Sequence, residues 1–107
     1  MKKNEDYHFI GLSADIKKAG VFVKDHLVVY YAEGRFYCFS KQCPHLPEVG
    51  DLSIGAFCPI NKTVKCPAHA VTYCLNTGIP VREAHRRLGS LDLYEPIELE
   101  GNLFIKI

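Results

Sequence analysis

Hydrophobic and polar residues alternate in short runs through the first forty residues, and a turn residue ends each run. Runs of this period that are rich in Val, Tyr and Phe favour strands over helices. Asp25-His26 and Glu33-Gly34 separate the last three runs and favour tight turns, so a three-stranded meander is predicted. One helical turn is predicted at 15–18, with Ser13 as its cap. The predicted strands are 7–10, 21–23, 27–32 and 35–39.

The pattern changes between residues 41 and 61, where Pro and Gly recur too often for a long regular element. Residues 83–88 favour either a helical turn or an exposed loop. Short strands without a long helix predict an all-β fold, a sandwich or a barrel. The later extended segments are 63–65, 71–73, 91–94, 96–99 and 103–107.

Composition and charge narrow the class of protein. The 107 residues are 48% hydrophobic and 23% charged, which is typical of one globular domain over 1–107. A net charge of +1 argues against a nucleic-acid partner. The longest apolar run, 27–32, is far short of the roughly 20 residues of a membrane helix.

The N-terminal residues and the number of cysteines indicate where in the cell the protein is located. Residues 1–6 place lysines before acids instead of before the apolar stretch of a secretion signal. Five cysteines are an odd number and do not favour a disulfide framework. A reducing cytoplasm is therefore the expected location, and cysteines there serve as ligands or as packing.

Two short motifs carry the candidate chemistry, Cys43-Pro44-His45 and Cys66-Pro67-Ala68-His69. Each offers one thiol and one imidazole, and the proline after each cysteine stiffens its loop. Together they supply a Cys2His2 ligand set. Zinc accepts such a set in a closed tetrahedron. A cysteine and a histidine in each loop also suit a two-iron cluster, with both thiolates on one iron and both imidazoles on the other.

The C-x-H and C-x-x-H pattern resembles the Rieske [2Fe–2S] family, and the resemblance covers nearly the whole chain. It implies a Rieske-like β-sandwich or barrel base with a small two-loop cluster-binding subdomain at about 41–79. It also implies one Rieske [2Fe–2S] cluster, with Cys43 and Cys66 on the buried iron and His45 and His69 on the outer iron. The other similar segments are 34–37 before the first loop, 51–55 ("PLSEG"), 73–78 ("FDLxTG") and the closing hairpin at 96–107.

The sequence departs from the family pattern in four respects. The gap between the ligand loops is longer than usual, which predicts an enlarged connecting hairpin. Ala70 stands where glycine is usual, and Glu48 and Ala68 occupy the positions of the disulfide of respiratory members. No proline-rich covering loop is present in 81–93. That segment carries Arg82, Arg86 and Arg87 instead, as a solvated face or as a docking patch for an acidic partner.

Two residues after the second loop bear on the reduction potential. Alternate residues of an extended segment share a face, so Val71 and Tyr73 point the same way. The resemblance implies serine and tyrosine at these positions in high-potential members. Val71 therefore predicts a potential toward the low end of the ~−150 to +300 mV range, with partial lift from the Tyr73 hydroxyl. The alternative is that this hydroxyl faces solvent.

The sequence shows no nucleophile, general base or substrate pocket, so a catalytic residue is not predicted. The resemblance implies a monomeric one-electron carrier that passes electrons from a flavin reductase to a terminal oxygenase or reductase. The alternatives are a small subunit of a nitrite reductase and, less favoured, a structural Cys2His2 zinc module. Cys38, Cys58 and Cys74 are predicted to pack as small hydrophobes, with a Cys58–Cys74 disulfide as the alternative.

Overall fold

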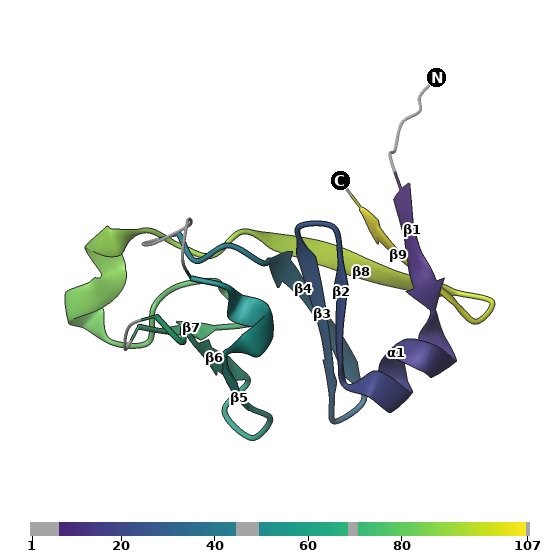
Figure 1. The fold of residues 1–107 in the computed structure, drawn as a ribbon, viewed down its shortest axis with the longest axis horizontal. Coiled ribbons are helices and arrows are strands. Elements are labelled where there is room, and N and C mark those ends of the chain that lie inside the picture. Colours follow the sequence, from purple (N-terminus) through teal and green to yellow (C-terminus); the bar gives the residue numbers. More distant parts are fainter. Residues whose placement is uncertain (1–6, 45–49, 69–70, 107) are drawn as a thin grey trace.

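Two antiparallel sheets make up the computed structural model, which describes residues 7–44, 50–68 and 71–106. A curled six-stranded sheet lies beside a three-stranded sheet (Figure 1). The larger sheet contains β1 (Tyr7–Leu12), β2 (Val21–Lys24), β3 (Leu27–Ala32), β4 (Arg35–Ser40), β8 (Leu93–Leu99) and β9 (Asn102–Lys106). The smaller sheet contains β5 (Ala56–Cys58), β6 (Thr63–Lys65) and β7 (Thr72–Cys74). The helical segments are α1 (Ser13–Ala19) and the 3-10 turns η1 (Leu52–Ile54) and η2 (Glu83–Leu88). The predicted all-β class is confirmed.

The larger sheet has the strand order β1-β9-β8-β4-β3-β2. Its β2-β3-β4 part is the predicted meander, with β3 at the predicted bounds. Two-residue hairpin turns that match the strand twist need a positive φ at both central positions. Glu33 and Gly34 have φ of 51° and 83°, and Glu100 and Gly101 in the β8–β9 turn have 52° and 81°.

The start of the chain differs from the prediction. Strand β1 continues through Gly11 to Leu12, with a register shift against β9 between Phe9 and Gly11. The predicted cap, Ser13, is wrong: Leu12 precedes the helix and no side-chain cap bond is present there. Ser13 is already the first helical residue, and its N–H donates to the Gly101 carbonyl at 2.9 Å.

Strand β8 joins the two extended segments that the sequence separates at Pro96. Its pairing with β4 covers only Cys38 with Tyr94 and Phe39 with Leu93. Pro96 therefore lies beyond the β4 ladder, where its missing N–H costs no strand hydrogen bond. No helix in the described part of the chain is long and apolar enough to cross a membrane.

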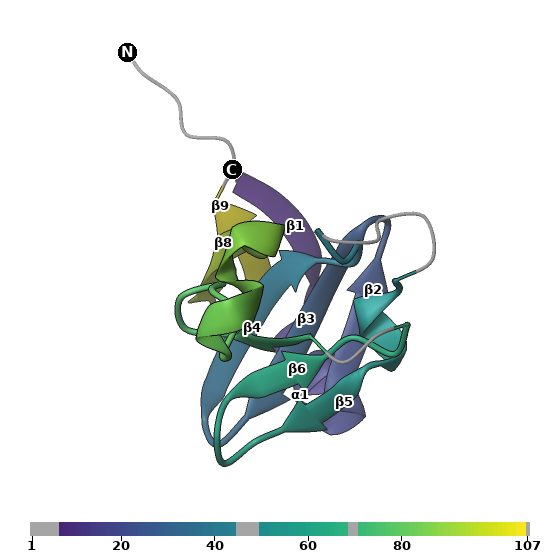
Figure 2. The same ribbon diagram turned by 90° about the vertical axis from the view of Figure 1, so that its left-hand side faces the viewer.

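Two buried clusters fill the fold. The first lies within the curl of the larger sheet and contains Ile10, Ile16, Leu27, Val29, Cys38, Leu103 and Ile105. The second joins one face of β3 and β4 to the smaller sheet, and Figure 2 shows β5 and β6 in front of the larger sheet. Its members are Val28, Tyr30, Ala32, Tyr37, Phe39, Cys43, Leu52, Val64, Cys66, Val71, Tyr73, Leu75 and Leu91.

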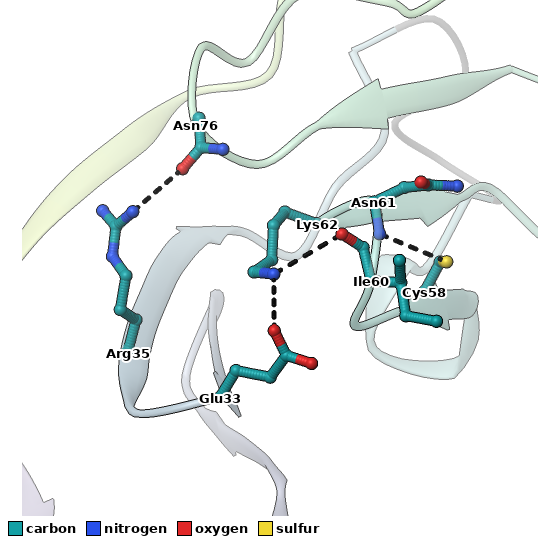
Figure 3. Close-up of polar contacts among 7 residues, drawn as sticks. All are labelled: Glu33, Arg35, Cys58, Ile60, Asn61, Lys62 and Asn76. Carbon is teal, nitrogen blue, oxygen red and sulfur yellow. Dashed lines mark hydrogen bonds and ion pairs between the residues drawn. The ribbon is translucent and has the colours of Figure 1, made fainter.

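Besides this shared core, ring and polar contacts join the smaller sheet to the β3–β4 hairpin. The rings of Tyr30 and Phe57 stack with centroids 4.5 Å apart. The Lys62 ammonium lies 2.9 Å from a Glu33 carboxylate oxygen, and Figure 3 shows this ion pair. The Arg35 guanidinium donates to the Asn76 side-chain oxygen at 3.4 Å (Figure 3). The hairpin thus sets where the smaller sheet sits.

Candidate metal centre

Cys43 closes the stem of a short hairpin that follows β4. Leu52 N–H donates to the Lys41 carbonyl at 2.8 Å, and Gln42 and Asp51 form a β-bridge. Cys43 N–H donates to the Gly50 carbonyl at 2.9 Å, the last hydrogen bond of this stem among the residues that the structure describes. Cys43 therefore lies at the end of the paired stem that the structure describes.

The stem continues into η1 through the Asp51 side chain. This carboxylate accepts from the Ser53 N–H at 3.0 Å and from the Ser53 hydroxyl at 2.6 Å. The Ser53 hydroxyl bond, together with the amide bond and nearby Lys41, lowers the pKa of Asp51 against the opposing effect of burial. The hydrogen bonds within the "PLSEG"-like segment, 51–55, thus fix the backbone that follows the first ligand loop.

Cys66 holds the same position in the second hairpin. Strands β6 and β7 pair through Lys65 and Thr72, and the Cys66 N–H then donates to the Val71 carbonyl at 2.9 Å. Each cysteine is followed by a proline, which has no N–H to satisfy beyond the end of the ladder. The repeated Cys-Pro pair in the sequence corresponds to two hairpin mouths of the same design.

Both cysteines are sealed from solvent. Cys43 and Cys66 are 0% and 1% exposed, and they share the second buried cluster with Val64, Val71 and Leu91. Thiolates are soft ligands that select iron–sulfur clusters, zinc or Cu(I), and the apolar surroundings fit the buried iron of a two-iron cluster. The predicted histidine ligands, His45 and His69, lie outside the described residues, as do Glu48 and Ala70.

Tyr73 reaches this site from β7. Its side chain is fully buried, and its hydroxyl oxygen lies 3.3 Å from the Cys43 sulfur. The alternative that this hydroxyl faces solvent is therefore wrong. A cysteine that binds metal as a thiolate has no proton, so in that state the phenol is the donor. Val71 is buried like Tyr73 and brings only methyl groups, whereas Thr72 between them is half-exposed.

The other three cysteines are free thiols in different settings. Burial in the curled sheet raises the pKa of Cys38 to about 12, so this thiol packs as predicted. Cys58 and Cys74 pair with Thr63 from opposite sides. Two strand spacings of about 4.8 Å separate their backbones, beyond the ~7 Å that a disulfide spans, so that alternative is wrong.

Cys74, like Cys58, is half-exposed, against the prediction that both are buried hydrophobes. Burial raises the pKa of its thiol, but hydrogen bonds from the Thr77 hydroxyl and from the Asn76 and Thr77 amides outweigh burial and lower the pKa. The turn after β7 therefore stabilises a thiolate at its edge. Sequence reasoning missed this effect, although Thr77 three residues after Cys74 was its visible sign.

The arginine-bearing segment lies beside the first ligand loop. Residues 83–88 form η2, one of the two forms that the sequence allowed. After η2, Gly89 has a φ of +110°, and a Cβ there would meet the Pro44 Cβ at 3.5 Å. The next residues enter the core, where Leu91 N–H donates to the Gly78 carbonyl at 2.7 Å. Sequence reasoning did not single out Leu91 as part of this buried cluster.

Comparison with known proteins agrees with this architecture. The family model of the Rieske [2Fe–2S] domain matches residues 7–92. A 3-phenylpropionate/cinnamic acid dioxygenase ferredoxin subunit from Photorhabdus laumondii subsp. laumondii is 27% identical over 86 residues, which cover 76% of this chain and 72% of the relative.

Two solved structures share the fold. The ferredoxin of carbazole 1,9a-dioxygenase from Nocardioides aromaticivorans IC177 superposes with a TM-score of 0.76 at 16% identity, over 92% of this chain and 96% of that one. A chain from a complex of reduced oxygenase and oxidized ferredoxin in carbazole 1,9a-dioxygenase gives 0.77 at 21% identity, over 95% and 94%. Because the family model spans most of the sequence and both cysteine hairpins, the chain belongs to the Rieske [2Fe–2S] domain family, and its cofactor is a [2Fe–2S] cluster.

Proposed function

We propose that this chain is the ferredoxin component of a dioxygenase system, which takes one electron from a flavin reductase and delivers it to a terminal oxygenase. The observation that carries the proposal is the pair of buried thiols, Cys43 and Cys66, at the mouths of two hairpins. The dioxygenase ferredoxin subunit with 27% identity supports it. The solved complex of an oxygenase with its ferredoxin supports the kind of partner.

Within this proposal, residues 41–79 form the cluster-binding subdomain of a single domain, 1–107. Cys43 and Cys66 bind the buried iron, and His45 and His69 bind the outer iron. The bound cluster supplies reversible one-electron chemistry. The protein's own part is to hold both thiols in a dry pocket, with Tyr73 donating a hydrogen bond to the Cys43 sulfur.

The proposal places the substrate chemistry on the partner oxygenase and leaves this chain the task of carriage. We further propose that it works as a monomer in the reducing cytoplasm. The free thiols of Cys38, Cys58 and Cys74 support a reducing location, because half-exposed thiols such as the last two persist where disulfides do not form.

A reconstitution tests the proposal. The reductase and oxygenase of a 3-phenylpropionate dioxygenase system are mixed with NADH and substrate, without that system's own ferredoxin. The purified holoprotein should restore product formation, and the Cys66→Ser variant should not. Iron and acid-labile sulfide are measured on the same sample. A colourless protein that holds zinc and no sulfide would contradict the proposal.

A further inference from the structure

The arginines of this chain are concentrated in one short segment. Three of its four arginines lie at 82, 86 and 87, and the other cations except Arg35 are lysines. Residues 82–88 carry these three arginines and one acid, Glu83. The rest of the chain carries ten basic and eleven acidic residues. A nearly neutral protein thus has one distinctly positive segment.

The fold itself makes little use of these charges. Arg82, Arg86 and Arg87 are exposed. Among the described residues, the ion pairs are Lys17–Glu98 and Lys62–Glu33, and neither includes an arginine of this segment. Arg86 donates from Nε to the Pro80 carbonyl at 3.4 Å, which leaves its two terminal amino groups for another acceptor.

The segment is joined directly to the strand that carries Tyr73. Val81 N–H donates to the Thr72 carbonyl at 2.8 Å, and Pro80 forms a β-bridge with Tyr73. The Tyr73 hydroxyl in turn lies 3.3 Å from the Cys43 sulfur. Figure 1 shows η2 at the end of the molecule away from α1. A protein bound to this segment would therefore be separated by strand β7 alone from Cys43, the proposed cluster ligand.

An apolar groove of about 400 Å³ lies beside the arginines. Ile79 and Val81 on its wall are 40% and 49% exposed, so both side chains are open to contact by another protein. An apolar centre with a charged, solvent-exposed rim is the usual composition of a docking interface. The groove is lined by Cys74, Thr77, Ile79, Pro80, Val81 and Arg86.

We propose that the groove and the three arginines form a docking surface, the arginine face, for an acidic redox partner protein. The partner presents carboxylates to Arg82, Arg86 and Arg87 and places an apolar side chain against Ile79 and Val81. Arginine suits this role because its guanidinium stays charged at any physiological pH, so the three side chains attract a surface that carries carboxylates. The inference rests on the proposed function of electron carriage and adds the chemistry of the partner.

The test compares two double variants that each remove two positive charges, and a third double variant that keeps them. Arg82→Gln/Arg87→Gln alters the arginine face at two residues without a side-chain bond among the described contacts. Lys17→Gln/Lys18→Gln is the matched control at the end of α1, and Arg82→Lys/Arg87→Lys keeps the charge. Each chemically reduced holoprotein is mixed in a stopped-flow instrument with cytochrome b5, an acidic haem protein, or with cytochrome c, a basic one.

The Gln variant should reduce cytochrome b5 about tenfold more slowly than the wild type at low ionic strength, because steering by opposite charge is lost. This difference should shrink at high salt and be absent with cytochrome c. The Lys variant and the α1 control should stay within about twofold of the wild type. Val81→Ser should slow the reaction about fourfold at both salt concentrations, because it removes apolar contact area.

The outcomes separate this inference from the proposed function. A wild-type protein that reduces neither haem protein would overturn both. If the wild type reduces both haem proteins and the Gln variant matches the α1 control, the arginine face is overturned and electron carriage stands. A Lys variant as slow as the Gln variant would also overturn it, because charge would then not be the cause. If Val81→Ser reacts as fast as the wild type, the apolar groove is not part of the docking surface.

Discussion

The two sheets of this protein are stabilised in different ways. The strands of the larger sheet are four to seven residues long and enclose a core of their own inside the curl. Each strand of the smaller sheet has three residues, and its core is shared with β3 and β4. Three-residue strands form few ladder bonds, so the smaller sheet needs support from outside itself.

The thiols assigned to the cluster lie in that shared core. Cys43 and Cys66 are packing residues of this core, and in the proposed function they are also ligands. Metal binding contributes directly to folding when the site does not exist in the unfolded chain. The larger sheet should keep its structure without the cofactor, whereas the smaller sheet should not.

The largest effect is expected from removing one thiol. In Cys66→Ser, bound iron and sulfide should fall to zero, and the amides of β5, β6 and β7 should lose protection from hydrogen exchange. The amides of β3 and β9 should remain protected, as measured by hydrogen-exchange mass spectrometry. Cys58→Ser, on the same sheet, is the control and should keep its iron. A smaller sheet that stays fully protected without iron would refute the contrast between the sheets.

A second large difference concerns the free thiols of the two regions. Burial raises the pKa of Cys38 to about 12, and the Thr77 and Asn76 hydrogen bonds outweigh burial to lower that of Cys74 below its ordinary 9.0. Only thiolates react, so at pH 8 iodoacetamide should modify Cys74 at least about a thousandfold faster than Cys38. The Cys74 rate should level off above its lowered pKa while the Cys38 rate still rises. Peptide mass spectrometry measures both rates, and similar rates would count against the assigned environments.

The joint between the sheets should show an intermediate effect. Phe57→Ala removes the ring that stacks on Tyr30, and because Phe57 is half-buried we expect about 2–3 kcal/mol less stability to urea. Phe9→Ala, on the outer face of β1, is the control and should cost less than about 1 kcal/mol. Equal costs would mean that the stack does not hold the smaller sheet in place.

The smallest effect should appear in the reduction potential. Tyr73→Phe removes a hydrogen bond to the Cys43 sulfur that favours the more negative, reduced cluster. A neutral bond is worth about 0.5–1.5 kcal/mol, and only the part that differs between redox states shifts the potential, so we expect it to fall by about tens of millivolts.

Tyr37→Phe is a control from the same buried cluster, because the Tyr37 hydroxyl is buried without a hydrogen-bond partner among the described residues. Its potential should not change. Voltammetry of both variants decides the matter, and an unchanged midpoint in Tyr73→Phe would show that the hydroxyl does not tune the cluster.

The larger sheet was the more predictable of the two. Alternation and two-residue turns located β2, β3 and β4 to within a residue at each end, because their signals are local. Strand β5 was missed, because three residues after Gly55 are too few to show a period. The Ser13 cap was wrong because the helix begins at Ser13 itself, whose N–H bonds the carbonyl of Gly101, far away in the sequence.

The site shows the same division between local and distant information. The Cys-Pro pairs marked both hairpin mouths, and alternation placed Val71 and Tyr73 on one face. Nothing local could tell that the Tyr73 hydroxyl lies beside Cys43, thirty residues away. Likewise, only the register of three strands separates Cys58 from Cys74.

The hairpin mouths have a consequence for protein engineering. The hydrogen bonds from Cys43 to Gly50 and from Cys66 to Val71 fix where each loop begins and ends, whatever lies between. A designer can therefore exchange residues of either loop other than His45 and His69, the ligands proposed for the outer iron, while the stems still fix the two ends of the loop. Each stem can therefore accept a loop from another member of the family. Such an exchange alters the outer surface of the metal centre without redesign of the sheet that carries the stem.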